Sequence, residues 1–199
     1  MSSVTQTQPQ RPKVLSPKKL AHVVLRTNNF SAMVQFYKDF LGARSEYEND
    51  RAAFLAYDEE HHRIGIFAFE HVEVPKIPSP GLEHIAFTFD NLDDLVTAYE
   101  QRKEYNIRPF WSVNHGATTS MYYRDPDGNR LESQVDNFEN NEEATAYVRS
   151  ETYDKNPIGA DFDPEELVRR VRSGEDHKAI KRMPDVGPRG FPTLPPTTG

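Results

Sequence analysis

Apolar residues gather between about positions 18 and 138, in short alternating stretches typical of strands and in two stretches with helical spacing. The first half of this region opens with a strand pattern, Leu20–Arg26, and continues into an amphipathic run, Met33–Leu41, which Gly42 ends. The alternation that follows predicts three further strands, at Ala43–Glu48, Arg51–Tyr57 and His62–Phe69.

The second half of the region repeats this order. A strand pattern at Leu82–Phe89 leads into a helix from Leu92 to about Lys103. Three strand patterns complete the copy, at Ile107–Val113, Thr118–Tyr123 and Arg130–Val135, with Asp125–Gly128 as a hairpin turn between the last two. The repeat therefore predicts two βαβββ modules, at about residues 20–75 and 82–137.

Neither module can cover both faces of its own sheet, so the two modules are expected to pack together. We predict an α+β domain over residues 18–138, in which the paired βαβββ modules form one curved mixed sheet around a shared cavity, with the helices outside. His22 and His84 occupy the third position of the first predicted strand in each module. The repeat would bring both side chains to that cavity.

Two flanking segments lie outside this domain. Residues 1–17 are rich in Ser, Thr, Gln and Pro and predict a disordered lead-in. Residues 139–199 form a charged C-terminal extension with a proline-rich end. Within the extension, Asp163 is a candidate N-cap and Pro164 suits a first turn, which predicts a short helix at about 163–173.

The amino-acid composition limits the kinds of metal site and binding partner that the chain can have. The chain has no cysteine, which excludes disulfides and thiolate metal sites and suits a cytoplasmic protein. Its net charge of −7 argues against a nucleic-acid partner, and no apolar run approaches the roughly 20 residues that span a membrane. Any bound metal must therefore be held by His and carboxylate side chains.

Three residues combine into a candidate metal site. A lone histidine on an apolar strand face is more often a core residue than a ligand, but His22 and His84 hold equivalent positions in a repeat. Glu132 lies on the last predicted strand, and a carboxylate that points into a cavity is costly unless it meets a cation. Two imidazoles and one carboxylate form the ligand set of non-haem Fe(II) oxygenases.

The segment VNHGATTSMYYRDPDGNRLE, residues 113–132, resembles the signature of the type I extradiol ring-cleaving dioxygenases. These enzymes, which include biphenyl-2,3-diol and catechol dioxygenases, belong to the vicinal-oxygen-chelate superfamily with the glyoxalases and bleomycin-resistance proteins. The resemblance covers roughly His22 to Asp136 and implies Fe(II), with Mn(II) as the alternative, held by His22, His84 and Glu132. It also implies that Tyr122 and His115 hydrogen-bond the substrate or bound oxygen.

A second match concerns His61 and His62. With the apolar strand that follows, this segment resembles the part of extradiol dioxygenases in which a histidine acts as the acid/base, and His62 is the residue in that position. The alternative reading is a polar loop that joins two strands. The resemblance therefore makes His62, Tyr122 and His115 the catalytic candidates.

Together these features predict an Fe(II)-dependent extradiol dioxygenase that cleaves a catechol-type substrate with O2. Phe110, Trp111 and Tyr123 are candidates for the wall of an aromatic pocket. One alternative is a glyoxalase-like lyase or isomerase, because Glu70 follows His22 at the same spacing as Glu132 follows His84 and would be a fourth ligand. Another is a non-catalytic binding protein of the same fold.

The chain departs from better-known family members in its size. Those enzymes often carry an extra double module ahead of the catalytic one, whereas this sequence has one double module. Pocket walls that the extra module would supply are missing or come from a partner subunit. Apolar strand residues such as Phe54, Phe67 and Phe69 also need cover, so we expect a homodimer or a higher homo-oligomer.

Overall fold

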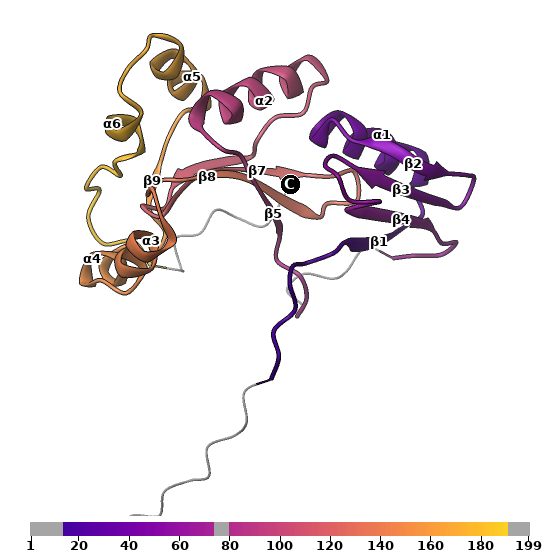
Figure 1. Ribbon diagram of the computed structural model, residues 1–199. Helices are drawn as coiled ribbons and strands as arrows, with labels where there is room; N and C mark the ends of the chain where they lie inside the picture. The colour runs from indigo at the N-terminus through magenta and orange to yellow at the C-terminus, as the bar shows by residue number, and fades with distance from the viewer. Residues whose placement is uncertain (1–13, 74–79, 191–199) are drawn as a thin grey trace, which may run out of the picture.

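The computed structural model describes residues 14–73 and 80–190 and contains the two predicted modules side by side (Figure 1). The first module comprises β1 (Val23–Thr27), α1 (Phe30–Leu41), β2 (Arg44–Glu48), β3 (Ala52–Ala56) and β4 (Ile64–Ala68). The second comprises β5 (Ile85–Thr88), α2 (Leu92–Glu104), β6 (Trp111–Asn114), β7 (Thr118–Arg124) and β8 (Arg130–Asp136). The βαβββ repeat and the α+β class are confirmed. The N-terminal part of the predicted lead-in and the last part of the proline-rich tail lie outside the described residues.

The strands form two sheets, so the prediction of one continuous curved sheet is wrong. The first sheet has the order β1-β4-β3-β2 and the second has the order β5-β8-β7-β6-β9. In each module the first strand runs parallel to the last strand of the same module, and the other pairings are antiparallel. No strand of one module pairs with a strand of the other among the described residues, so side chains join the modules.

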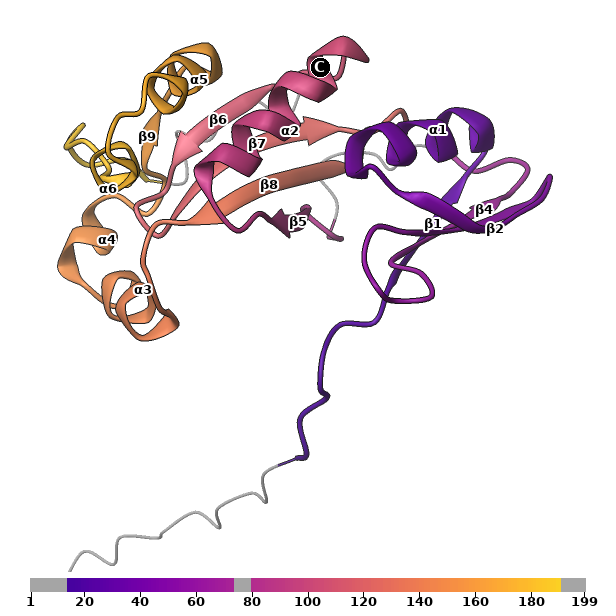
Figure 2. The ribbon, with the colours of Figure 1, turned by 45° about the horizontal axis from the view of Figure 1, so that its top comes forward.

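The helices α1 and α2 lie on the same side of the two sheets, as Figure 2 shows. Both helices bury their apolar sides in one hydrophobic core that runs through both modules. Gly42 ends α1 in the left-handed conformation, with φ of 61°, which a glycine adopts without strain. Asn91 caps α2 by accepting a hydrogen bond from the Asp94 backbone N–H at 2.9 Å.

Two buried polar contacts tie α1 to the second module. Arg102 of α2 is only 2% exposed, and its guanidinium donates hydrogen bonds to the Phe40 carbonyl and to the Ser133 Oγ, each at 2.8 Å. Its guanidinium carbon also lies 3.7 Å from the centre of the Phe40 ring. Tyr37 donates a hydrogen bond to Asp125 at 3.1 Å. The modules are therefore joined on their helix-covered side.

The C-terminal extension is more structured than its composition predicts. It contains α3 (Asn141–Val148), α4 (Glu151–Lys155), β9 (Ala160–Asp161), α5 (Pro164–Arg172) and α6 (His177–Lys181). The predicted helix is confirmed as α5, with Asp163 accepting a hydrogen bond from the Glu165 N–H at 2.9 Å. The extension surrounds the end of the second sheet that lies away from the first module (Figure 1). Across residues 14–73 and 80–190, no helix is long and apolar enough to cross a membrane.

Candidate metal and ring-binding site

His84 and Glu132 meet on the second sheet. His84 lies immediately before β5, which pairs with β8, and its Nε2 is 2.9 Å from the Glu132 carboxylate. The Nδ1 of His84 contacts the carboxylate of Glu83, so both ring nitrogens face an acceptor. The hydrogen bond to Glu132, together with that to Glu83, raises the pKa of His84 to about 9. In the protein without metal, this shift favours the imidazolium form at neutral pH.

Glu132 is a buried anion whose charge is balanced by its neighbours. The residue is 4% exposed, and such burial by itself would raise the pKa of its carboxyl. Hydrogen bonds from His84 and Ser120 outweigh this effect and hold the pKa below its ordinary value. A buried carboxylate next to an imidazole is a donor pair that suits a divalent metal, which would displace the shared proton on binding.

Tyr122 and His115 form a second pair beside the first. Tyr122 of β7 is directly opposite Glu132 of β8, so both side chains are on the same face of the sheet. The hydroxyl of Tyr122 lies 3.0 Å from the Nε2 of His115, and the Nδ1 of His115 lies 2.6 Å from the Ile158 carbonyl oxygen. A carbonyl oxygen can only accept, so Nδ1 of a neutral His115 carries the proton, and both the His115 Nε2 and the Glu132 carboxylate are acceptors for the Tyr122 hydroxyl. Burial lowers the pKa of His115, which favours this neutral form.

Both pairs open into one pocket of about 540 Å³. Its wall is largely apolar and aromatic, and includes Phe110, Trp111, Val148, Tyr153, Pro157 and Ile158. The prediction that Phe110 and Trp111 line the pocket is confirmed, whereas that for Tyr123 is wrong. Alternation along β7 places Tyr123 on the opposite face from Tyr122, where it packs against the Phe40 ring at 5.1 Å.

His22 and His62 lie together on the first module. Each precedes its strand, β1 or β4, and their ring centres are 4.4 Å apart. The His62 ring also lies 4.8 Å from that of Phe54, and its Nδ1 lies 2.6 Å from the Nδ1 of His61. Burial and the nearby charges of His22 and His61 lower the pKa of His62. Neither His22 nor His62 lines the pocket on the second sheet.

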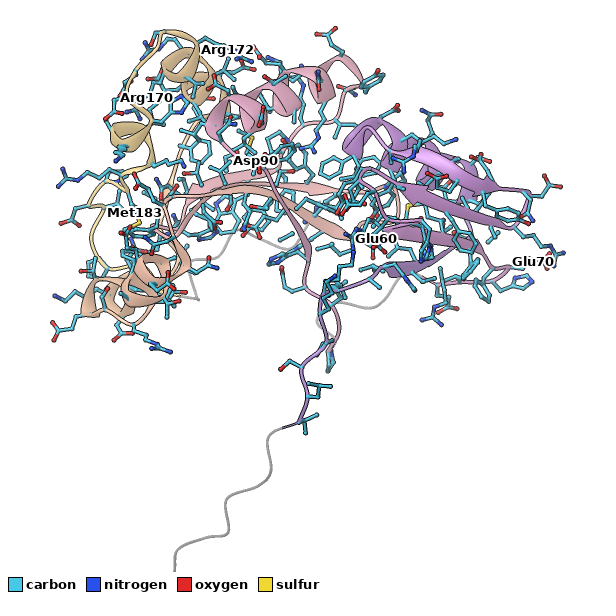
Figure 3. All side chains as sticks on the ribbon, viewed as in Figure 1. Glu60, Glu70, Asp90, Arg170, Arg172 and Met183 are labelled. Atoms are coloured by element: carbon cyan, nitrogen blue, oxygen red, sulfur yellow. The ribbon has the colours of Figure 1, made fainter. Side chains whose placement is uncertain are left out.

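The expectation that the repeat brings His22 and His84 to one shared cavity is therefore not met within this chain. Among the residues that the structure describes, no three His, Asp or Glu side chains are grouped so as to hold a metal ion. Two of the three predicted ligands, His84 and Glu132, are in contact, and His22 lies against His62 instead. Glu70 is exposed in the turn after β4, at the outer end of the first module (Figure 3).

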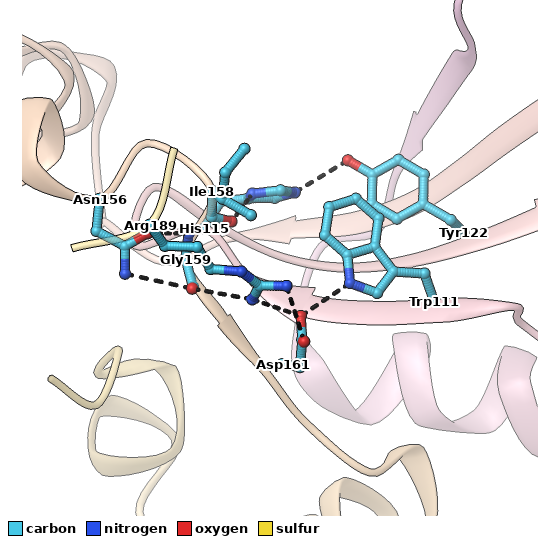
Figure 4. Close-up of polar contacts among 8 residues, drawn as sticks. All are labelled: Trp111, His115, Tyr122, Asn156, Ile158, Gly159, Asp161 and Arg189. Atoms are coloured by element: carbon cyan, nitrogen blue, oxygen red, sulfur yellow. Dashed lines mark hydrogen bonds and ion pairs between the residues drawn. The ribbon is translucent and has the colours of Figure 1, made fainter. Parts of the chain in front are cut away.

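The C-terminal extension contributes to the site in a way that the sequence did not predict. The main chain of Ile158 holds His115, and Asp161 of β9 accepts a hydrogen bond from the Trp111 indole at 2.8 Å (Figure 4). Arg189 in turn donates to both carboxylate oxygens of Asp161, at 2.7 and 2.9 Å. No motif marks these residues, because their contacts depend on a two-residue strand that docks on β6.

Comparison with known proteins places the chain in a family. Residues 19–133 match the model of the glyoxalase/bleomycin resistance protein/dioxygenase superfamily. The chain is 47% identical over 158 residues to biphenyl-2,3-diol 1,2-dioxygenase 3 of Rhodococcus globerulus, covering 78% of this chain and 83% of that protein. It is 43% identical over 157 residues to biphenyl-2,3-diol 1,2-dioxygenase 2 of the same organism, with the same coverage of both chains.

Solved structures share the fold. A glyoxalase/dioxygenase from Nostoc punctiforme matches with a TM-score of 0.53 and 19% identity, over 64% of this chain and 99% of that one. A glyoxylase/bleomycin resistance protein/dioxygenase domain from Frankia sp. EAN1pec matches with a TM-score of 0.51 and 17% identity, over 61% and 93%. The chain belongs to the glyoxalase/bleomycin resistance protein/dioxygenase superfamily.

Proposed function

We propose that this protein is an extradiol dioxygenase that cleaves the aromatic ring of a catechol-type substrate beside its two hydroxyl groups. The observation that carries the proposal is the convergence of His84, Glu132, Tyr122 and His115 on one aromatic pocket, in a chain 47% identical to a biphenyl-2,3-diol 1,2-dioxygenase. One ring carbon–carbon bond is broken and both atoms of O2 enter the product. The reaction consumes no external reductant.

The proposed cofactor is Fe(II), with Mn(II) as the alternative, held by His84, Glu132 and His22. His84 and Glu132 already stand together, whereas His22 is proposed from its equivalent repeat position and the family resemblance. When bound, the metal would supply a common binding point for the diol oxygens and O2, and a route for electrons between them.

Tyr122 and His115 are proposed to hydrogen-bond and orient the oxygen atoms of the substrate. Without substrate, the Tyr122 hydroxyl and the His115 Nε2 lie 3.0 Å apart at the pocket and contact each other. A substrate that displaced this contact could accept a hydrogen bond from the Tyr122 hydroxyl or donate one to the His115 Nε2. Such a fixed pair can orient a substrate hydroxyl and stabilise negative charge as it develops. His62 is proposed as the acid/base, since a neutral imidazole can accept a proton near pH 7 and return it.

A homodimer or higher homo-oligomer is also proposed. The face of the first sheet that α1 does not cover carries Val24, which is 44% exposed, and Tyr47, which is 49% exposed, beside the half-buried Phe54 and Phe67. A second copy of the chain is the simplest cover for this surface and brings another His22 with it. Light scattering at micromolar concentration should give at least twice the chain mass of 22.9 kDa. A fully active protein at the single-chain mass would contradict the proposal.

The activity is tested by loading the protein with Fe(II) under anaerobic conditions and then admitting O2 with a panel of catechols, including 2,3-dihydroxybiphenyl. We expect a yellow ring-fission product and one O2 consumed for each diol. Metal-free protein serves as the control and should be inactive. O2-independent turnover of a hemithioacetal, without ring cleavage of any catechol, would contradict the dioxygenase proposal and favour a glyoxalase-like reaction.

A further inference from the structure

The extension closes the side of the pocket next to β6, although it lies beyond the residues that the family model matches. The family match ends at residue 133, yet Val148, Tyr153 and Ile158 all line the pocket. The short strand β9 pairs antiparallel with β6, with Val113 opposite Asp161 and Asn114 opposite Ala160. The extension therefore reaches His115 through the backbone as well as through side chains.

The segment before β9 approaches the backbone of His115 unusually closely. A Cβ added to Gly159 would lie 2.1 Å from the Asn114 carbonyl oxygen and 2.7 Å from the His115 Cα, and the φ of Gly159 is +98°. Asn156 is buried and bonds to Gly159 on both sides, accepting from its N–H at 2.7 Å and donating to its carbonyl at 3.3 Å. This tight approach brings the Ile158 carbonyl to within 2.6 Å of the His115 Nδ1.

One ion pair secures the far end of the same segment. Arg189 forms a two-pronged pair with Asp161, and its Nη1 also donates to the Gly159 carbonyl at 3.3 Å (Figure 4). The backbone N–H of Arg189 donates to the Lys155 carbonyl at 3.2 Å, so the returning chain is itself held in place. Asp161 thus receives Arg189 from one side and the Trp111 indole N–H from the other.

Two chains of contacts connect this ion pair to the hydroxyl of Tyr122. Along the first, Asp161 holds Trp111, whose ring stacks on that of Tyr122 at 4.9 Å and 23°. Along the second, the Ile158 carbonyl keeps the proton of His115 on Nδ1, which leaves Nε2 to accept from the Tyr122 hydroxyl at 3.0 Å. Loss of the ion pair would loosen both supports at once.

We propose that Arg189 and Asp161 are positioning residues of the pocket, which hold residues 156–161 against β6 and thereby set the orientation of Trp111 and the ring tautomer of His115. This inference rests on the proposed function only for its effect on turnover. The effects on Trp111 and His115 are properties of the folded protein without metal or substrate. They are measurable whether or not the protein cleaves catechols.

The test compares Arg189→Met, which removes the charge, with Arg189→Lys, which keeps it. Arg169→Met is the matched control, because it breaks an exposed arginine–glutamate pair with Glu166 in the same extension, away from the pocket. Trp111 is the chain's only tryptophan, so emission excited at wavelengths that the nine tyrosines do not absorb reports this one indole. The ¹⁵N chemical shifts of the His115 ring report which nitrogen carries the proton.

In Arg189→Met we expect emission shifted to longer wavelength as Trp111 meets more water, and a mixture of His115 tautomers. With the Fe(II)-loaded protein, we expect kcat for 2,3-dihydroxybiphenyl to fall about tenfold or more, with a smaller change in KM, as for a misplaced reacting group. Arg189→Lys should recover part of each property, because its ammonium keeps the charge but cannot reproduce the two-pronged pair. Arg169→Met should match the wild type.

The proposal is overturned if either the emission or the His115 shifts of Arg189→Met stay at wild-type values. It is also overturned if Arg169→Met changes them equally, because the effect would then be general loosening of the extension. A wild-type protein that cleaves no catechol would count against the proposed function alone. The emission and the ring shifts would still decide whether Arg189 and Asp161 position the pocket.

Discussion

The two modules have the same order of strands and helices, but the carboxylates at equivalent positions, Glu70 and Glu132, have very different surroundings. Glu132 lies inside β8, a strand of seven residues flanked by β5 and β7, and is 4% exposed. Glu70 comes after β4, which has five residues and ends at Ala68, and it is exposed in a turn. The repeat therefore reproduces the order of strands and helices but not the burial of each side chain. Whether the carboxylate is buried depends on whether the strand extends far enough to include it.

The modules also differ in what covers the face opposite their helix. On the second sheet, α3, α4 and the loop before β9 complete a pocket of about 540 Å³ around Tyr122 and Glu132. On the first sheet the corresponding face leaves Val24 and Tyr47 exposed, with His22 and His62 at its edge. The difference comes from residues after 139, which add to the second sheet and, through β9, extend it.

The largest expected effect is a difference in Fe(II) binding between variants of Glu132 and of Glu70. Glu132→Gln should lower the affinity for Fe(II) by more than about 100-fold, because it removes the proposed negative ligand, and the groups that support a metal ligand are alone worth 10- to 100-fold. Anaerobic equilibrium dialysis with metal analysis measures this. Glu70→Gln is the matched control and should bind Fe(II) like the wild type. Retention of metal by Glu132→Gln, or its loss in Glu70→Gln, would reverse the comparison.

The second prediction tests whether the first module contributes His62 to ring cleavage. His62→Gln should slow ring cleavage by about 100-fold, the usual weight of a positioned acid/base, while Fe(II) and diol binding persist. Single-turnover kinetics on the loaded protein give the rate. His71→Gln is the control, because His71 is exposed in the turn after β4. Equal rates for His62→Gln and the wild type would leave the chemistry to the second module.

A smaller effect concerns the joint between the modules. Tyr37→Phe removes the buried hydrogen bond from α1 to Asp125 and should lower the free energy of unfolding by about 1–2 kcal/mol. Urea denaturation monitored by circular dichroism measures the change. Tyr47→Phe removes an exposed hydroxyl that accepts from Asn49 and should cost much less. Equal losses in the two variants would mean that the Tyr37–Asp125 contact does not join the modules.

The smallest effect is a pH dependence at the same joint. Burial raises the pKa of Asp125 above its ordinary value of 3.8, so the folded state disfavours the charged carboxylate. Its stabilising contribution is present below that ordinary pKa and is lost as pH rises through the folded value. The wild type should therefore gain stability relative to Asp125→Asn as pH falls from 7 toward about 4. Urea denaturation across this range tests the slope, and a pH-independent difference would contradict the assignment.

The sequence by itself determined the two modules and predicted four residues that line the pocket of the candidate site. Apolar periodicity encodes each strand and helix locally, and the turn at Asp125–Gly128 places Tyr122 opposite Glu132 across a hairpin. His84 and His115 follow from the repeat and from the motif at residues 113–132. The outcome for these four residues was predictable because their partners are near in sequence or related by the repeat.

Only the tertiary structure decided the division into two sheets, the place of His22 and the wall of the pocket. Local periodicity states which residues form a strand but not which strand lies beside it, so one sheet and two sheets share the same pattern. Trp111 meets Asp161, and His115 meets Ile158, through a strand of two residues that has no apolar periodicity of its own. Such contacts depend on the docking of distant segments, and that docking exists only once both modules and the extension have folded.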